Sequence, residues 1–519
     1  MDKAKILLVL ILFVSIINNV YSEDGVFKLS LNDAIKMAIE KNLDIRVESF
    51  NVAQFEVDAQ RSWAIYDPTL AFKITYDYTY SPANKQATDN LPPSSTNFLS
   101  PSMDKDAIPR ISEVTSTEVE TIVFNSSLSQ LLRTGGTLSA VFNNTYTNTI
   151  TQSTVSDYNY WQINVGFNFT QPLLKNFGRE NTELNISTSY LSKEASIERF
   201  RNFLSAIVSQ VCTEYFKLYS LNEKLKARKT SLELAHTILN ETNAKNRAGI
   251  LPSIEILNAE FGVALREKEL IEAEKDVKNQ IDSIKLLLQL TTESDIEVVD
   301  LPKKEFLEVN EIEAIHKALN RYDILEQKKN LEITKLQSRV YKNNILPDLS
   351  LFFSTYLTSI DSSYLGPFED TPAWGVGLNL TYPLGNTAAV NDYHKSLLKT
   401  EQLTLKIRSL EENAKNDVRS AIRDVTSRYK QIEVTERGMK FAEERFRAFR
   451  LKYDVGLATV KDILEVESDL VDAKYNHIQA IIDYNNAIIH LWTITGEILD
   501  KVGIRIDEGY INHLYKSVY

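Results

Sequence analysis

Two stretches of the chain repeat nearly the same alternation of apolar and polar residues. Residues 165–173 read VGFNFTQPL, and residues 376–384 read VGLNLTYPL. In each, large apolar side chains alternate with small or polar ones, which predicts a β-strand with one apolar face and one polar face. Each stretch reaches a proline, Pro172 or Pro383, which cannot donate to a strand ladder. The polar face of such a strand could line water.

Two further stretches alternate in the same way, each directly after a proline. Residues 31–64 carry apolar side chains at helical spacing, and after Pro68 the pattern changes to strict alternation over 70–80. In the second half, Pro347 precedes an alternating stretch at 349–358. The pattern therefore predicts four amphipathic strands with aromatic-rich apolar faces.

The segment after the first predicted strand is long and polar. Residues 81–120 are rich in Ser, Thr, Asn, Asp and Pro without periodicity, which predicts an exposed loop. Residues 124–132 and 137–147 then have the length of two more strands, of which the second alternates clearly. This extra pair departs from the otherwise simple pattern.

Helical periodicity follows each repeated strand. Residues 182–248 contain neither proline nor glycine, and at about 1.5 Å per residue they would form a helix on the order of 100 Å long. A second long helix is expected at 388–453. Apolar residues spaced mostly three and four apart give each helix the seam of a coiled coil, namely Leu204, Val208, Val211, Tyr215, Leu218 and Leu225 in the first and Ala414, Val418, Ala421, Val425 and Ile432 in the second.

The two halves of the chain repeat one order of elements. Each long helix is expected to end at a turn glycine, Gly249 or Gly456, and an Ile-Leu pair follows both glycines at a constant offset of 207 residues. Shorter helices are expected at 253–290 and 459–495. This self-similarity predicts a duplicated architecture, with a first structural repeat at 23–300, a second at 301–500 and a C-terminal tail at 501–519.

The N-terminus has the pattern of a secretory signal peptide. Lys3 and Lys5 precede an apolar run at 6–17, and Val20 and Ser22 stand where a signal peptidase reads small residues. We therefore expect residues 1–22 to be removed on export. Beyond them no stretch of 18 or more apolar residues occurs, so an exported chain that crosses a membrane would have to cross it with strands.

Composition excludes several kinds of function. The formal net charge is −12, which makes a nucleic-acid partner unfavourable. The single cysteine, Cys212, excludes an internal disulfide and a multi-cysteine metal site. The six histidines lack the spacing of metal ligands, and the lone GxG motif at 375–377 lies within a strand pattern. We expect no enzyme, no bound metal and no cofactor.

Four amphipathic strands cannot close a barrel by themselves, and lipid does not tolerate an open sheet edge. Strands of about 9–12 residues match the length of a tilted transmembrane strand, and Tyr and Trp suit the membrane interfaces. Several copies of the chain are therefore expected to share one barrel.

The ordered set of these features resembles the TolC family of outer-membrane efflux proteins. The resemblance is carried by the duplicated plan, by the strand ends QPL at 171–173 and YPL at 382–384, and by the turn YDVGLAT at 453–459 followed by DILE at 462–465. It implies an α+β membrane protein in the outer membrane. A homotrimer would form one shared transmembrane β-barrel, continuous with a long α-helical coiled-coil tunnel in the periplasm.

The resemblance also implies a function and partners. The chain would be the passive export duct of a tripartite efflux or type I secretion system, docked to a periplasmic adaptor (a membrane fusion protein) and an inner-membrane pump of the RND or ABC type. The cargo could be a drug, a metal or a polypeptide. The alternative from another class is a periplasmic coiled-coil structural or adhesion protein.

The family pattern assigns roles to residues around the second turn. Asp462 and Glu465 match acidic residues that narrow the periplasmic aperture, and their spacing of three places both on one helix face. In three chains they would form two stacked acidic rings that favour cations. Glu465 stands where Asp is typical. Tyr453 and Glu255 match a gate link between the two turns, whereas Ala458 replaces an expected basic gate partner.

Two further sets of residues follow from the resemblance. The hairpin turns, where the adaptor would dock, comprise Gly249, Leu251, Gly456, Leu457, Ala458 and Thr459. The joints between barrel and helices would be Pro68, Pro172, Pro347 and Pro383.

The extra strand pair leaves two arrangements open. The hairpin from Phe124 to Thr147 could widen the trimeric barrel from about 12 to about 18 strands, or fold outside the barrel or at its rim. We favour the second arrangement slightly, because polar residues such as Asn125, Ser127 and Gln130 would make a poor lipid face.

Overall fold

The computed structural model describes residues 27–82, 116–151, 157–291, 294–364, 366–368, 372–504 and 509. The expected signal peptide at 1–22 and most of the expected tail at 501–519 lie outside these residues. The chain divides into two compact units, which are described separately. A helical unit comprises Met1–Asp58, Tyr190–Glu332 and Glu401–Tyr519, and a sheet unit comprises Ala59–Ser189 and Ile333–Thr400.

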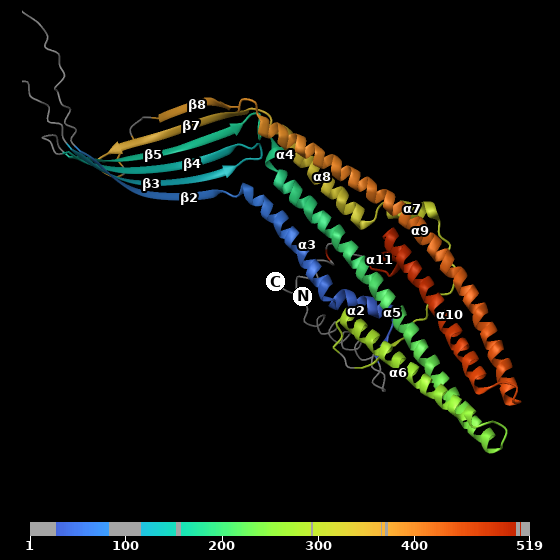
Figure 1. Ribbon diagram of the computed structural model, residues 1–519. Helices are drawn as coiled ribbons and strands as arrows, with labels where there is room; N and C mark the ends of the chain where they lie inside the picture. The colour runs from blue at the N-terminus through green and yellow to red at the C-terminus, as the bar shows by residue number, and fades with distance from the viewer. Residues whose placement is uncertain are drawn as a thin grey trace, which may run out of the picture. The chain divides into compact units, whose positions relative to one another are not determined.

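The sheet unit is built on six antiparallel strands in the order β2-β3-β4-β5-β7-β8 (Figure 1). Their bounds are Thr69–Ser81 (β2), Thr117–Leu131 (β3), Thr137–Thr151 (β4), Tyr158–Pro172 (β5), Asp348–Asp361 (β7) and Pro372–Thr381 (β8). The four strands predicted from alternation are confirmed as β2, β5, β7 and β8. The strand β7 pairs with β5 across the long intervening helical segment, so the two halves of the chain share one sheet.

The extra hairpin lies inside this sheet, so the favoured arrangement of residues 124–147 outside it is wrong. The strand β3 pairs with β2 along the whole of β2, from Thr69 opposite Ser129 to Ser81 opposite Thr117. Asn125 pairs with Lys73 on the polar face of the sheet, so its polar side chain does not lie among the apolar side chains of the other face. The expected exposed loop at 81–120 lies mostly outside the described residues, and its last residues, 117–120, belong to β3.

The register places most of the large apolar side chains of the six strands on one face of the sheet. Aromatic contacts run across this face, with ring centroids 6.1 Å apart for Phe72 and Phe124 and 4.8 Å apart for Tyr146 and Trp161. Many of these side chains are exposed, including Ile74 at 71% and Trp374 at 72%. An exposed apolar face of this size marks a membrane or protein contact. This apolar face includes Phe72, Ile74, Phe124, Leu128, Phe142, Tyr146, Trp161, Val165, Phe167, Phe353, Leu357, Trp374, Val376 and Leu378.

The polar face carries two tight aromatic contacts over glycines. The ring of Tyr356 and the carbonyl oxygen of Thr355 lie where a Cβ on Gly166 would stand, and the Tyr356 hydroxyl donates to Asn168 Oδ1. The ring of Phe352 lies over Gly377 in the same way. These glycines are therefore required by the close approach of a neighbouring ring.

Replacement of Gly166 by alanine is expected to destabilise the sheet by about 1–3 kcal/mol, because the new methyl would overlap both a ring and a backbone oxygen. The matched control is Gly375→Ala on β8, where the nearest atom to the new Cβ would be Ser354 Oγ at 3.4 Å. Unfolding by denaturant in detergent measures both free energies. Equal stabilities of the two variants would contradict the prediction.

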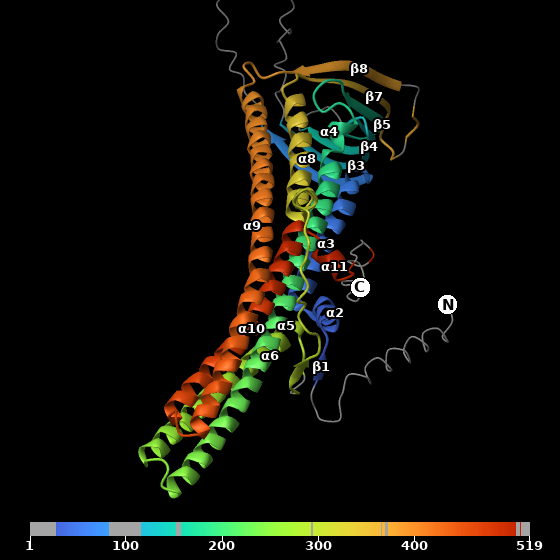
Figure 2. The same cartoon turned by 90° about the vertical axis from the view of Figure 1, so that its right-hand side faces the viewer.

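The helical unit contains two long helical hairpins (Figure 2). Helix α5 (Leu184–Arg247) turns into α6 (Ile254–Leu288), and α9 (Thr387–Asp454) turns into α10 (Val460–Thr495). The helical unit also contains α2 (Leu31–Lys41), α7 (Glu311–Ala318) and α11 (Ile498–Lys501). Helices α3 (Leu43–Arg61) and α8 (Tyr322–Asn343) begin in this unit and end in the sheet unit, which also contains α4 (Arg179–Thr182) and a 3-10 turn at Ser62–Tyr66. Among the residues described, no helix is both long enough and apolar enough to cross a membrane.

The predicted coiled-coil seams are confirmed. Leu204, Leu218, Ala414 and Val418 are fully buried, and the remaining seam residues are buried or packed against the same cores. Cys212 lies in the first core, where burial raises the pKa of its thiol to about 12. The thiol therefore stays protonated and packs as a small apolar group.

The single helix expected at 31–64 is wrong, because the chain breaks at Asn42. Asn42 has extended backbone dihedrals, with φ −61° and ψ 126°. Its side-chain oxygen accepts from the backbone N–H groups of Asp44 and Ile45, and its amide donates to Leu287 O at 2.9 Å. One buried asparagine thus ends α2, caps α3 and attaches both to α6.

A short parallel strand pair closes the first half of the helical unit. The strand β1 (Phe27–Leu29) pairs with β6 (Ile296–Val298), and the sequence predicted neither. The buried Tyr215 hydroxyl donates to Leu29 O at 3.0 Å and accepts from the backbone N–H groups of Val299 and Asp300. Asp300 in turn accepts from Leu31 N at 2.7 Å.

Candidate functional site at the turn end

The two hairpin turns lie at the same end of the helical unit (Figure 2). Gly249 and Gly456 both adopt left-handed backbone conformations, with φ of 72° and 78°. Ile250 N donates to Lys245 O, and Leu457 N donates to Lys452 O, which are the six-to-one bonds of glycine-ended helices. Glycine is needed at both positions because other residues rarely adopt this conformation.

The tips of the turns expose apolar side chains. Ile250 is 65% exposed, and Leu457 is 78% exposed. Leu251 is half-buried, and Ala458 packs against the buried cluster below the second turn. Of the residues predicted to form the docking turns, Leu457 is thus exposed at a tip, whereas Leu251 and Ala458 are partly buried beneath the tips.

The start of α10 uses Thr459 and Asp462 as a capping box. Thr459 Oγ1 accepts from Asp462 N at 3.1 Å, while Asp462 Oδ2 accepts from Thr459 N at 2.9 Å. These hydrogen bonds from Thr459 lower the pKa of the Asp462 carboxyl. Asp462 therefore has a structural role at the helix N-terminus besides the predicted aperture role. Glu465, one turn further along, is exposed.

The capping box predicts a pH dependence of stability. A lowered pKa in the folded state means that ionised Asp462 stabilises the fold above its ordinary pKa of 3.8, and that this contribution is lost as pH falls through the lowered value. Melting temperatures of the wild type and of Asp462→Asn should therefore differ at pH 6 and converge at pH 3 or below. A difference that stays constant with pH would contradict this role of the carboxylate.

Tyr453 joins the two hairpins from a buried position. Its side chain is 1% exposed, and its hydroxyl lies 2.8 Å from Thr242 Oγ1 on α5. Lys245 Nζ donates to Tyr453 O at 3.0 Å and lies 4.0 Å from the centre of the Tyr453 ring. Burial raises the pKa of Tyr453, so its hydroxyl stays protonated.

Glu255 makes a second link between the hairpins. Its Oε2 accepts from Val460 N at 3.1 Å, at the first residue of α10. A carboxylate at a helix N-terminus is favourable because the unpaired N–H groups carry partial positive charge. Tyr453 and Glu255 do not bond to each other, but each ties the α5–α6 hairpin to the α9–α10 hairpin.

A third link was not predicted from the sequence. Arg450 on α9 donates to Glu241 Oε1 on α5 at 2.5 Å and lies 3.6 Å from Asp454.

Thr242 and Lys245, which both contact Tyr453, were also not predicted from the sequence. A signal was present for Thr242, because the seam of α5 continues at four-three-four spacing to it through Ser231, Ala235 and Ile238, all of which are buried. The cations Lys245 and Arg450 stand beside Tyr453 although position 458 is alanine.

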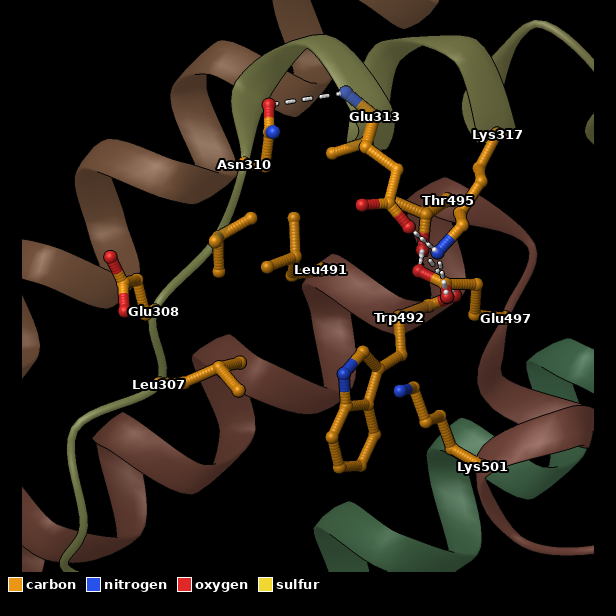
Figure 3. A pocket seen from close by; sticks show the side chains of 12 residues that line it. Leu307, Glu308, Asn310, Glu313, Lys317, Leu491, Trp492, Thr495, Glu497 and Lys501 are labelled. Atoms are coloured by element: carbon orange, nitrogen blue, oxygen red, sulfur yellow. Dashed lines mark hydrogen bonds and ion pairs between the residues drawn. The ribbon is translucent and has the colours of Figure 1, made fainter.

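The helical unit also has a small hollow away from the turns (Figure 3). It encloses about 180 Å³ between α7, α10 and α11, with Trp492 and Asn310 in its lining. Lys317 Nζ lies 2.6 Å from Glu313 and 2.8 Å from Glu497, and these carboxylates raise its pKa. The charged groups at the centre of the hollow, Lys317, Glu313 and Glu497, therefore pair with one another. Within the described residues no group of three or more His, Cys, Asp or Glu could hold a metal ion.

Solved structures share this combination of sheet and helical hairpins. The Campylobacter jejuni CmeC outer membrane channel matches with a TM-score of 0.62 and 15% identity, over 92% of this chain and 90% of that one. The Neisseria gonorrhoeae MtrE outer membrane channel, in its open state, matches with a TM-score of 0.61 and 14% identity, over 90% and 89% of the two chains. The fold is therefore that of the outer-membrane channels, which mix helices and strands.

Sequence comparison identifies the family. The model of the outer membrane efflux protein family matches residues 34–288 and 315–497, and the chain belongs to this family. TolC of Salmonella enteritidis is 22% identical over 287 residues, which are 52% of this chain and 56% of that protein. TolC of Vibrio cholerae is 19% identical over 367 residues, or 67% and 80% of the two chains. The chain is placed in the outer membrane and extends into the periplasm.

Proposed function

We propose that three copies of the chain form one outer-membrane channel-tunnel that serves as a passive export duct. The single observation that carries this proposal is the open sheet. Within the described residues β2 and β8 each pair on one side only, and the apolar face is exposed. Because an open edge is unfavourable in lipid, three sheets joined edge to edge offer a solution, with about 18 strands in a closed barrel.

The duplicated plan forms part of this proposal. Residues 23–300 and 301–500 would be two structural repeats, each contributing one long helical hairpin to a periplasmic tunnel. The order of elements supports this proposal, because α2 and α3 precede β2, α7 and α8 precede β7, and each half ends in a long helical hairpin. Pro68, Pro172, Pro347 and Pro383 would be the joints, since each lies at or within two residues of a strand end.

The turn end would be the periplasmic aperture and its gate. Asp462 and Glu465 from three chains would form two acidic rings, and Tyr453 and Glu255 would hold the hairpins together in the closed state. The support is geometric. Asp462, Glu465 and Tyr453 lie within about three helical turns of Gly456, and Glu255 lies within two turns of Gly249.

The tunnel needs partners that supply energy and cargo. A periplasmic adaptor would dock on the exposed tips, including Ile250 and Leu457, and an inner-membrane pump of the RND or ABC type would drive export. Exposed apolar tips beside polar side chains are typical of a protein-binding surface.

Reconstitution tests the channel proposal. The mature protein should require detergent for solubility, have the mass of a trimer within the detergent micelle, and produce discrete conductance steps in planar lipid bilayers. A water-soluble monomer without conductance would exclude the channel and favour a periplasmic coiled-coil structural or adhesion protein.

A further inference from the structure

A buried ion pair connects α6 and α10, about three turns from the start of α6 and about two turns from the start of α10. Arg266 Nη2 donates to Glu467 Oε2 at 3.0 Å and to the carbonyl oxygen of Leu464 at 2.7 Å. The two charged side chains are only 5% and 3% exposed. Charged residues are rarely buried so completely unless they are paired.

The helices approach each other closely at this point. The side chain of Leu464 occupies the place where a Cβ on Gly262 would stand, so the missing side chain of Gly262 admits it. Beyond the pair, Arg228 of α5 lies 3.1 Å from both Glu269 on α6 and Asp472 on α10. These contacts pack the two helices around the ion pair.

The contacts between α6 and α10 define one parallel register. From the tips inward, Glu255 meets Val460, Gly262 meets Leu464, and Arg266 meets Glu467. A slip of one heptad, about 10 Å along the helix axis, would leave both charges buried and unpaired. A purely apolar seam would tolerate such a slip much better.

Stability alone does not explain the pair. Burial removes both charges from water, and Arg266 Nε is buried without a hydrogen-bond partner among the described residues. A pair of this kind contributes little net stability compared with well-packed apolar residues, but it disfavours alternative packings.

We propose that the Arg266–Glu467 pair sets the register of α6 against α10 and thereby positions the turn end. The proposal rests on the function proposed above, in which the turn end is the gate. Correct register brings Glu255 to the N-terminus of α10 and orients the helix face that carries Asp462 and Glu465. Arg266 and Glu467 are thus positioning residues for the gate.

Spin labels can measure the register directly. In a Cys212→Ala background, labels at the exposed Glu260 and Lys461 report the α6–α10 distance within one chain, once labelled chains are diluted with unlabelled ones. The wild type should give one narrow distance. The variant R266M/E467M should fold, form trimers and melt near the wild-type temperature, yet give a broad or second distance and a larger closed-state current in bilayers.

Two further variants make the test specific. The charge-swapped variant R266E/E467R should restore the narrow distance and the low current. The control R445M/D469M removes an exposed pair between α9 and α10, at 2.8 Å, and should behave as the wild type. An unchanged narrow distance in R266M/E467M would overturn the proposal.

A milder substitution keeps the test decisive if R266M/E467M does not fold. Glu467→Gln preserves size and an acceptor but removes the charge, so it should broaden the distribution of spin-label distances. A distribution as narrow as that of the wild type would overturn the proposal.

Failure of the channel function is recognised separately. A wild type that never conducts, with distances that respond as described, rejects the channel and leaves the register role standing.

Discussion

The double variant Y453F/E255A should conduct more in its closed state than the wild type. Phenylalanine removes the hydrogen bond between Tyr453 and Thr242, and alanine removes the acceptor for Val460 N. Each bond contributes about 0.5–1.5 kcal/mol, so their joint loss should shift the ratio of open to closed channels by roughly 5- to 150-fold. Single-channel recording in planar bilayers measures this shift.

The control for this prediction is Tyr484→Phe. Tyr484 is also fully buried in the helical unit, and its hydroxyl donates to Glu305 O at 2.8 Å, but it lies far along α10 from the turns. Its replacement should cost similar stability without raising the current. If Y453F/E255A conducts no more than the wild type, these residues do not hold the closed state.

Neutralising the predicted aperture should abolish most of the cation preference of the channel. In the proposed trimer D462N/E465Q removes six negative charges from the proposed constriction, so the potassium-to-chloride permeability ratio should fall several-fold towards one. Asparagine at position 462 retains an oxygen that can accept from Thr459 N, so the start of α10 should remain capped. Reversal potentials in asymmetric KCl provide the measurement.

The matched control for the aperture is E272Q/E274Q. Both glutamates are exposed on α6, well past the turn, and the change in charge is the same. This variant should keep the wild-type permeability ratio. Equal losses of selectivity in the two variants would show that selectivity reflects the total charge of the protein rather than an acidic constriction.

Periodicity predicted the regular parts of the fold well. A period of two located β2, β5, β7 and β8, because one apolar face fixes the alternation of every residue. The four-three spacing located both long helices and their seams, because a coiled coil repeats one contact many times. The weak alternation of β3 did not reveal its place in the sheet, because Ser126 stands on the apolar face where an apolar residue would have given the pattern.

Features that depend on single side chains or distant partners escaped prediction. Asn42 breaks a helix without proline or glycine, because its side chain replaces the lost backbone bonds and also reaches Leu287. At the turn end, Tyr453 and Glu255 could be singled out by resemblance, but their partners could not. Thr242 and Val460 become partners only when α5, α6, α9 and α10 pack together.

The pairing of β1 with β6 has a consequence for the order in which the chain acquires its structure. Leu31 and Asp300 are 269 residues apart, so β1 cannot pair until almost the whole first half has left the ribosome and crossed the inner membrane. Contacts so distant in sequence form slowly. During this interval β1 presents an unpaired edge. Once the Tyr215 hydroxyl bonds both Leu29 and Val299, the two ends of the first half are held together, but their core still needs Ile482, Ile489 and Leu499 from the second half.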